Sequence, residues 1–193
     1  MKIKSGLSLA FSILLTVAGL SACNRSDKVE AAREPDSVND RGSVLNQGDK
    51  DFIVYASEMH VGEINMAKQA KEKSMNKDVR DYADSVIRAH SDALDQLSDA
   101  MDKNAPDSKV GSLDTKMHMQ FLASLPEEQF NREFITLMIA DHRDASETFR
   151  SELGSTQNED LKNYVQKALP ALENGLQDAQ KLEKGMTPQK AKS

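Results

Sequence analysis

Apolar residues recur at spacings of three, four and seven over most of the chain from Asp51 onward, which is the pattern of an amphipathic helix. This periodicity predicts four long helices and one short one, at about 51–73, 77–101, 113–122, 126–153 and 159–184. Each long helix has an apolar stripe and a charged opposite face, so we expect the stripes to pack together. The predicted fold class is therefore all-α, a four-helix bundle with a short extra connector helix.

The stripes also name the candidate core. They consist of Phe52, Ala56, Met59, Met66 and Ala70 in the first long helix; Val79, Ala83, Val86, Ala93, Leu94, Leu97 and Met101 in the second; Phe134, Ile135, Met138, Ala145, Phe149 and Leu153 in the third; and Leu161, Val165, Ala168, Leu169, Leu172, Leu176 and Ala179 in the fourth. Pro106 is expected to prevent continuation of the second long helix, and Gly154 to stop the third. Pro170 is expected to bend or locally break the fourth.

The first 23 residues have the organisation of a secreted precursor. A basic start from Met1 to Lys4 precedes an apolar run from Gly6 to Gly19, which is too short to span a bilayer. The stretch Leu20-Ser21-Ala22-Cys23 resembles the lipobox of bacterial lipoproteins, in which the cysteine is acylated and the chain is cut just before it. The alternative is a plain secretory signal with a chance cysteine. Cys23 is thus predicted as a lipidation site that would incorporate palmitate.

These features divide the chain into four parts. We expect residues 1–22 to be a lipoprotein signal peptide, 23–50 a lipidated flexible tether, 51–184 the four-helix bundle domain and 185–193 a disordered tail. Asn24 follows the anchor cysteine, where Asp would resemble a signal for inner-membrane retention. This favours an outer-membrane lipoprotein that faces the periplasm.

Composition excludes several functions. The chain has 25 Lys plus Arg against 31 Asp plus Glu, a formal net charge of −6, and it has no basic cluster, which argues against nucleic acid as a partner. A single cysteine rules out an intramolecular disulfide. We therefore expect membrane attachment through the lipid anchor, and otherwise an unidentified protein or small ligand as partner.

Three ionisable residues lie on the apolar stripes: Glu63, His90 and His142, each on a different long helix. A buried charge is costly unless it is paired, so these side chains are expected to meet each other, a water molecule or a metal. Two imidazoles and a carboxylate suit Zn, Mn or Fe(II). Two interpretations stay open, a structural hydrogen-bond cluster and a site for a divalent metal ion or small ligand. In either case, ionised Glu63 is expected to favour a protonated histidine, so that acid would loosen the cluster.

Di-iron chemistry is not expected. The di-iron centres of ferritin-like enzymes use Glu-x-x-His pairs on two helices, and this chain contains no such pair. Ile87 and Ile139 occupy the positions three residues before His90 and His142, where the glutamates would have to stand.

A second group of donors is Met117, His118 and Met119, with Met59 and His60 elsewhere in the chain. Thioether and imidazole groups suit Cu(I), which makes these residues alternative copper ligands. The competing interpretation is that Met117 fills the core while His118 faces solvent.

Four short motifs follow one another along the chain. They are Asp51-Phe52-Ile53-Val54-Tyr55-Ala56 with Gly62-Glu63, Tyr82-Ala83 before His90, Phe130-Asn131-Arg132-Glu133-Phe134 before Asp141-His142, and Ala168-Leu169-Pro170-Ala171-Leu172. In this order and spacing they resemble domain-of-unknown-function family 4142, a family of secreted or outer-membrane bacterial proteins. The resemblance covers about 51–182. It implies a ferritin-like bundle and an envelope location, and no activity, because the family's role is not established.

Two positions depart from the family's pattern. Ala89 stands where the family usually has an acidic residue before the first inward histidine, and Gly175 stands where it usually has a further histidine. The resemblance therefore implies that an imidazole that could have been a fourth metal ligand is missing here.

The chain offers little for covalent chemistry. It has no Gly-x-Ser-x-Gly elbow, no free cysteine once Cys23 is acylated, and no glycine-rich phosphate loop. We therefore expect a non-enzymatic, membrane-anchored lipoprotein with a binding or envelope-stress role. The alternative is a metal-binding or metal-dependent ferritin-like protein that uses the interior Glu63, His90 and His142.

Overall fold

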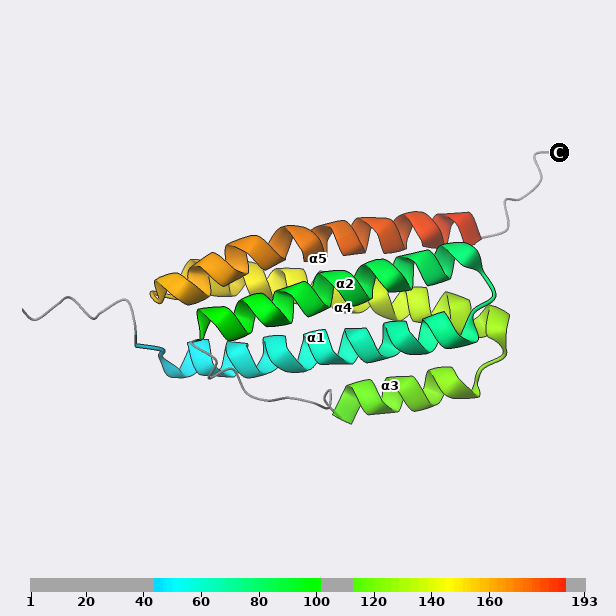
Figure 1. Ribbon diagram of the computed structural model, residues 1–193, viewed down its shortest axis with the longest axis horizontal. Helices are drawn as coiled ribbons and strands as arrows, with labels where there is room; N and C mark the ends of the chain where they lie inside the picture. The colour runs from blue at the N-terminus through cyan, green and yellow to red at the C-terminus, as the bar shows by residue number, and fades with distance from the viewer. Residues whose placement is uncertain (1–43, 102–112, 187–193) are drawn as a thin grey trace, which may run out of the picture. The chain divides into compact units, whose positions relative to one another are not determined.

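Five α-helices make up the regular structure of the residues that the computed structural model describes, 44–101 and 113–186 (Figure 1). They are α1 (Gln47–Lys73), α2 (Lys77–Ala100), α3 (Leu113–Ser124), α4 (Glu127–Ser155) and α5 (Glu159–Met186). The all-α prediction is confirmed for this part of the chain. Cys23, the segment around it and Pro106 lie outside the described residues.

The four long helices pack as a bundle of two hairpins. Helices α1 and α2 form one hairpin and α4 and α5 the other, and the hairpins meet through α1 against α4 and α2 against α5. The shorter α3 contacts α1 and α4 on the outside. Because α3 runs back along the bundle, α2 and α4 run in the same direction, as the colour gradient in Figure 1 shows.

Asparagine side chains define where three helices begin. Asn46 accepts a hydrogen bond from the Asp49 N–H, and the Asp49 carboxylate accepts one from the Asn46 N–H, so the two residues form a reciprocal cap on α1. Asn76 caps α2 in the simpler manner, and Asn158 accepts from the Leu161 N–H at the start of α5. The cap at Asn46 explains why α1 begins four residues before its predicted start, inside the segment predicted as tether.

Two expected helix breaks do not occur. Helix α4 continues through Gly154 to Ser155, and the Thr156 N–H closes it by donating to the Glu152 carbonyl. Helix α5 is continuous across Pro170, so the local break does not occur there, and Ala168 and Leu172 on either side are buried. It also extends to Met186, so two residues of the predicted tail are helical.

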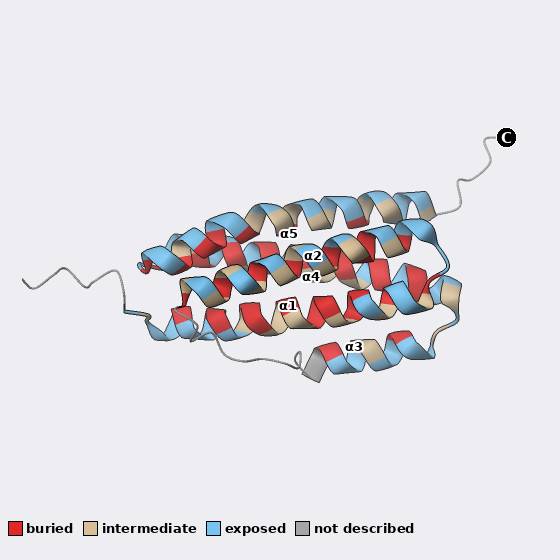
Figure 2. Ribbon diagram, viewed as in Figure 1, coloured by how far each residue is buried: buried red, intermediate tan, exposed pale blue. Residues whose placement is uncertain are grey.

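Buried residues, red in Figure 2, lie along all four long helices, and the apolar ones form two separate clusters. One contains residues from 66 to 70 of α1, 79 to 86 of α2, 130 to 139 of α4 and Ala179. The other contains residues from 52 to 56 of α1, 93 to 97 of α2 with Met101 just after its end, 145 to 149 of α4 and 161 to 172 of α5. On every long helix the two clusters leave a gap of several residues. Polar side chains fill that level of the bundle.

Candidate functional site

The layer between the two apolar clusters brings together the three ionisable residues singled out from the sequence. Glu63 of α1, His90 of α2 and His142 of α4 are 1%, 3% and 1% exposed. One ligand atom from each can be chosen so that all lie within 4.8 Å of one another. The shared level follows from the sequence pattern, since each residue takes a core position in the middle of its helix.

The Glu63 carboxylate is the centre of the cluster. Its Oε2 lies 3.2 Å from His90 Nε2 and 3.3 Å from His142 Nδ1. These contacts are close but poorly aligned, and neither oxygen of the carboxylate has a hydrogen-bond partner among the described residues. Such a buried, unpartnered oxygen costs about 1–3 kcal/mol, and more for a charged group. The layer therefore contains an acceptor whose bonding capacity the protein itself leaves unused.

His142 is held by the backbone of its own helix. Its Nδ1 lies 2.9 Å from the Met138 carbonyl oxygen. A carbonyl can only accept, so Nδ1 carries the ring proton and the lone pair of the neutral imidazole is on Nε2. That nitrogen faces α5, where a Cβ at Gly175 would lie 2.5 Å from His142 Cδ2 and closer still to Nε2. Only glycine fits at position 175 with this histidine in place.

Two further members of the layer, His60 of α1 and Tyr164 of α5, were not predicted from the sequence. His60, 1% exposed, shares hydrogen bonds of 2.9 Å with His90 Nδ1 and 2.7 Å with the Tyr164 hydroxyl. Our stripe for the first helix passed through Met59, which is only partly buried and lines a pocket. The signal for His60 was its place three residues before Glu63, which puts both side chains on one helix face.

Burial sets the protonation of the layer. Desolvation raises the pKa of Glu63 well above its usual value, with the charge of Asp141 adding to the effect. Desolvation lowers the pKa of His60 to about 3 and of His142 to about 4, and lowers that of His90 well below its usual range. These shifts favour the neutral carboxyl and the neutral imidazoles in the metal-free layer, and they disfavour the expected ion pair between Glu63 and a protonated histidine, because burial of charge is costly.

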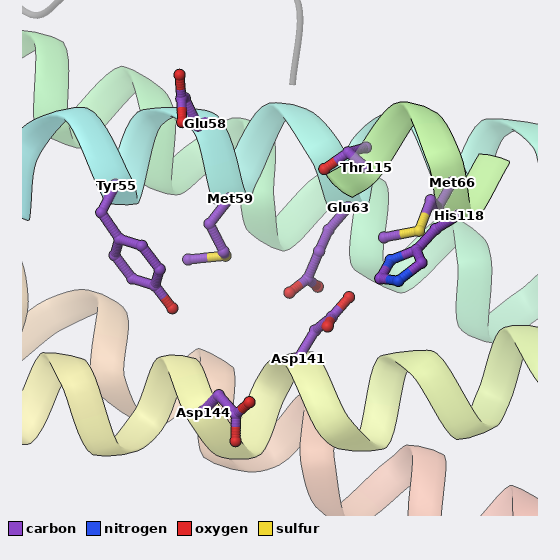
Figure 3. A pocket seen from close by; sticks show the side chains of 9 residues that line it. All are labelled: Tyr55, Glu58, Met59, Glu63, Met66, Thr115, His118, Asp141 and Asp144. Atoms are coloured by element: carbon purple, nitrogen blue, oxygen red, sulfur yellow. The ribbon is translucent and has the colours of Figure 1, made fainter. Parts of the chain in front are cut away.

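Cavities open on both sides of the layer. One of about 310 Å³ is formed by α1, α3 and α4 and includes Glu63 in its lining (Figure 3). Its other lining residues are Tyr55, Glu58, Met59, Met66, Thr115, His118, Asp141 and Asp144. A second cavity, of about 200 Å³, lies between α2, α4 and α5, and both His90 and His142 line it, together with Gly175 and Asp178.

The three residues considered as copper ligands do not converge. Met117 is 59% exposed, His118 lines the pocket that contains Glu63, and Met119 packs against an apolar cluster. Consecutive helical residues point in different directions, so a run of three cannot close on one ion. The competing interpretation is wrong for Met117, which is outside the core, while His118 is half-buried and lines the pocket.

An all-helical bundle with a buried layer of histidines and one carboxyl defines the class of this protein. The chain belongs to a family of unknown function, whose model, "Domain of unknown function (DUF4142)", matches residues 35–182. Comparison with curated protein sequences gave no match.

A solved structure with a similar fold is titled "Crystal structure of DUF305 fragment from Deinococcus radiodurans". It shares 16% identity with this chain at a TM-score of 0.64, covering 72% of this chain and 97% of the other. At this identity the likeness concerns the fold alone. Among the described helices, none is long and apolar enough to cross a membrane.

Proposed function

We propose that this protein binds a divalent transition-metal ion through Glu63, His90 and His142. The observation that carries the proposal is the Glu63 carboxylate, which is completely buried, has no hydrogen-bond partner among the described residues, and faces two imidazole rings. Two imidazole nitrogens and one carboxylate oxygen form a donor set that Zn²⁺, Mn²⁺ and Fe²⁺ accept. When bound, the ion would supply a positive charge that compensates the buried carboxylate.

The chain's own residues prepare one of the three ligands, His90, whereas a second, His142, must rearrange. If His90 offers Nε2, its ring proton is on Nδ1 and is donated to His60, whose other nitrogen then donates to the Tyr164 hydroxyl. Such outer hydrogen bonds fix the tautomer and orientation of a ligating histidine. His142 must either release the Met138 carbonyl or turn its ring, and the cavity beside Gly175 leaves space for the turn.

A metal-free hydrogen-bond cluster is the competing function for the same residues. It would require the Glu63 carboxyl to donate to His90 or accept from His142 with good alignment. Neither oxygen has such a partner, which favours the metal-binding alternative over a binding module without metal. The lack of a Glu-x-x-His pair still argues against di-iron chemistry.

The proposal also places the bundle in the cell envelope. We infer that Cys23 is acylated and holds the protein at the outer membrane, facing the periplasm, with a tether between anchor and bundle. The support is the lipobox-like Leu20-Ser21-Ala22-Cys23 and the Asn24 that follows it. A ferritin-like arrangement belongs to the same proposal, and its support is the long crossover between α2 and α4 that contains α3.

Metal analysis of protein purified without chelator tests the function. We expect close to one ion per wild-type chain, and its loss in Glu63→Gln, which keeps the shape of the side chain and removes its charge. Glu58→Gln is the matched control, because Glu58 lies on the same helix at the pocket wall and not in the layer. Metal-free wild type that does not take up Zn²⁺, Mn²⁺ or Fe²⁺, or a Glu63→Gln variant that keeps its ion, would contradict the proposal.

A further inference from the structure

We propose that the pocket between α1, α3 and α4 is the route by which the cation reaches the buried layer, with Asp141 and His118 as its first binding station. This inference rests on the proposed function and concerns how the ion arrives. The route ends at Glu63, which lines the pocket and is also a ligand of the layer.

The chemistry of the pocket suits a divalent cation. Its lining contains the carboxyl groups of Glu58, Glu63, Asp141 and Asp144, and none of its lining residues is Lys or Arg. A concave site lined by one sign of charge concentrates ions of the opposite sign and speeds their association. The imidazole of His118 and the thioethers of Met59 and Met66 add softer donors to this wall.

An independent observation shows that the pocket leads to a ligand. The Glu63 side chain is 1% exposed, yet it points into the pocket in Figure 3 and neither carboxylate oxygen has a hydrogen-bond partner among the described residues. A group of acidic residues alone would be an ordinary solvated surface. Here the pocket reaches the buried Glu63 carboxyl oxygens, which have no hydrogen-bond partner among the described residues.

Asp141 connects the pocket to the layer. It precedes His142 on α4, and Figure 3 shows its carboxylate directed toward the same space as the Glu63 carboxylate and the His118 ring. A cation held between Asp141 and His118 would therefore have the Glu63 carboxyl group ahead of it, at the level of the layer.

The cavity on the opposite side is the competing route. It touches His90 and His142 directly, but its lining has a single carboxylate, Asp178, among mainly small or neutral residues. Asp178→Asn thus makes the same charge change on the far side of the layer. This gives the test a matched control.

The experiment measures the rate of Co²⁺ binding to metal-free full-length protein by stopped-flow absorption, with dissociation followed after addition of a chelator. In Asp141→Asn we expect association to slow about tenfold, the lower range for electrostatic steering. In His118→Gln we expect it to slow because an imidazole donor is lost from the pocket. Asp178→Asn should keep wild-type rates.

The outcomes separate the two proposals. Wild-type protein that does not bind Co²⁺ overturns the metal site and the route together. Binding with equal rates in all variants, or slowing only in Asp178→Asn, overturns the route and leaves the site. A weaker Kd in Asp141→Asn with an unchanged association rate would make Asp141 a ligand, which also overturns its role as a station. Far-UV circular dichroism of each variant excludes loss of fold as the cause of any change.

Discussion

Replacing Gly175 with Ala should destabilise the metal-free protein through a single atomic contact. The new Cβ would lie 2.5 Å from His142 Cδ2, which no real pair of carbons tolerates. Either α5 must move away from α4, or the His142 ring must move and strain its hydrogen bond to the Met138 carbonyl. Both responses disturb a layer whose side chains are almost fully buried.

The expected cost follows from opposing effects. Overpacking a well-packed interior costs about 1–3 kcal/mol. Weakening a buried hydrogen bond adds about 1 kcal/mol. Ala is favoured over Gly inside a helix by about 1 kcal/mol, which acts in the other direction. We therefore expect a net loss of about 1–3 kcal/mol in the free energy of unfolding, and weaker metal binding because the His142 ring can no longer turn.

Urea unfolding followed by far-UV circular dichroism measures this loss. Gly154→Ala is the matched control, since Gly154 also lies in a helix but has no atom within 4 Å of where a Cβ would be. It should leave stability unchanged or raise it by up to about 1 kcal/mol. A Gly175→Ala protein at least as stable as Gly154→Ala would refute the reasoning, since the contact with His142 would then cost nothing.

Three further predictions concern the layer and the anchor. The effects of Glu63→Ala and His90→Ala on the free energy of unfolding, measured with denaturant, should be non-additive, because each substitution removes a contact of the other residue. Strict additivity would mean that the two residues act independently. The folded-state pKa of about 3 for His60 and about 4 for His142 lies below the unfolded value of 6.5. The contribution of these histidines to the stability of the metal-free protein should therefore be complete above pH 6.5 and fall toward pH 4, as the unfolded chain takes up protons. His60→Gln should lose less over this range, a comparison that separates the histidines from the carboxyls, whose raised pKa acts in the opposite sense; equal losses would contradict the assignment. Radiolabelled palmitate should enter the wild type and not Cys23→Ser, and equal labelling of both would rule out Cys23 as the anchor.

The periodicity of apolar residues predicted the five helices closely, because packing of one face is what stabilises a helix in a bundle. It failed at boundaries set by single side chains. The cap at Asn46 lies in a polar stretch that looks like tether, and Gly154 can remain helical because nothing requires a left-handed conformation there.

Within the site, the pattern of apolar stripes identified the residues better than it identified their protonation state. Glu63, His90 and His142 could be found because each interrupts an apolar stripe. His60 was passed over because its neighbour Met59 fitted the stripe equally well. The neutral state of the layer could not be predicted from spacing, since it depends on how completely neighbouring helices exclude water from these side chains.

Gly175 was noted in the sequence only as a departure from a family pattern. The structure gives it a positive role that no single sequence shows, since the contact with His142 depends on the distance between α4 and α5. Glycine at position 175 thus removes one possible ligand, the family's histidine, and leaves the space in which another candidate ligand, His142, fits.

The division of the core into two apolar clusters has a consequence for how the helices are aligned along their axes. One apolar layer can pack against another almost as well as against its own partner. In a bundle made only of such layers, one helix could therefore slide along its axis by a turn, about 5.4 Å, at little cost. Here the same slip would move a histidine or Glu63 into one of the apolar clusters and leave it without polar neighbours. A single buried polar position is known to fix register in coiled coils in this way. The layer at Glu63 thus sets the axial alignment of the four long helices, whether or not an ion is bound.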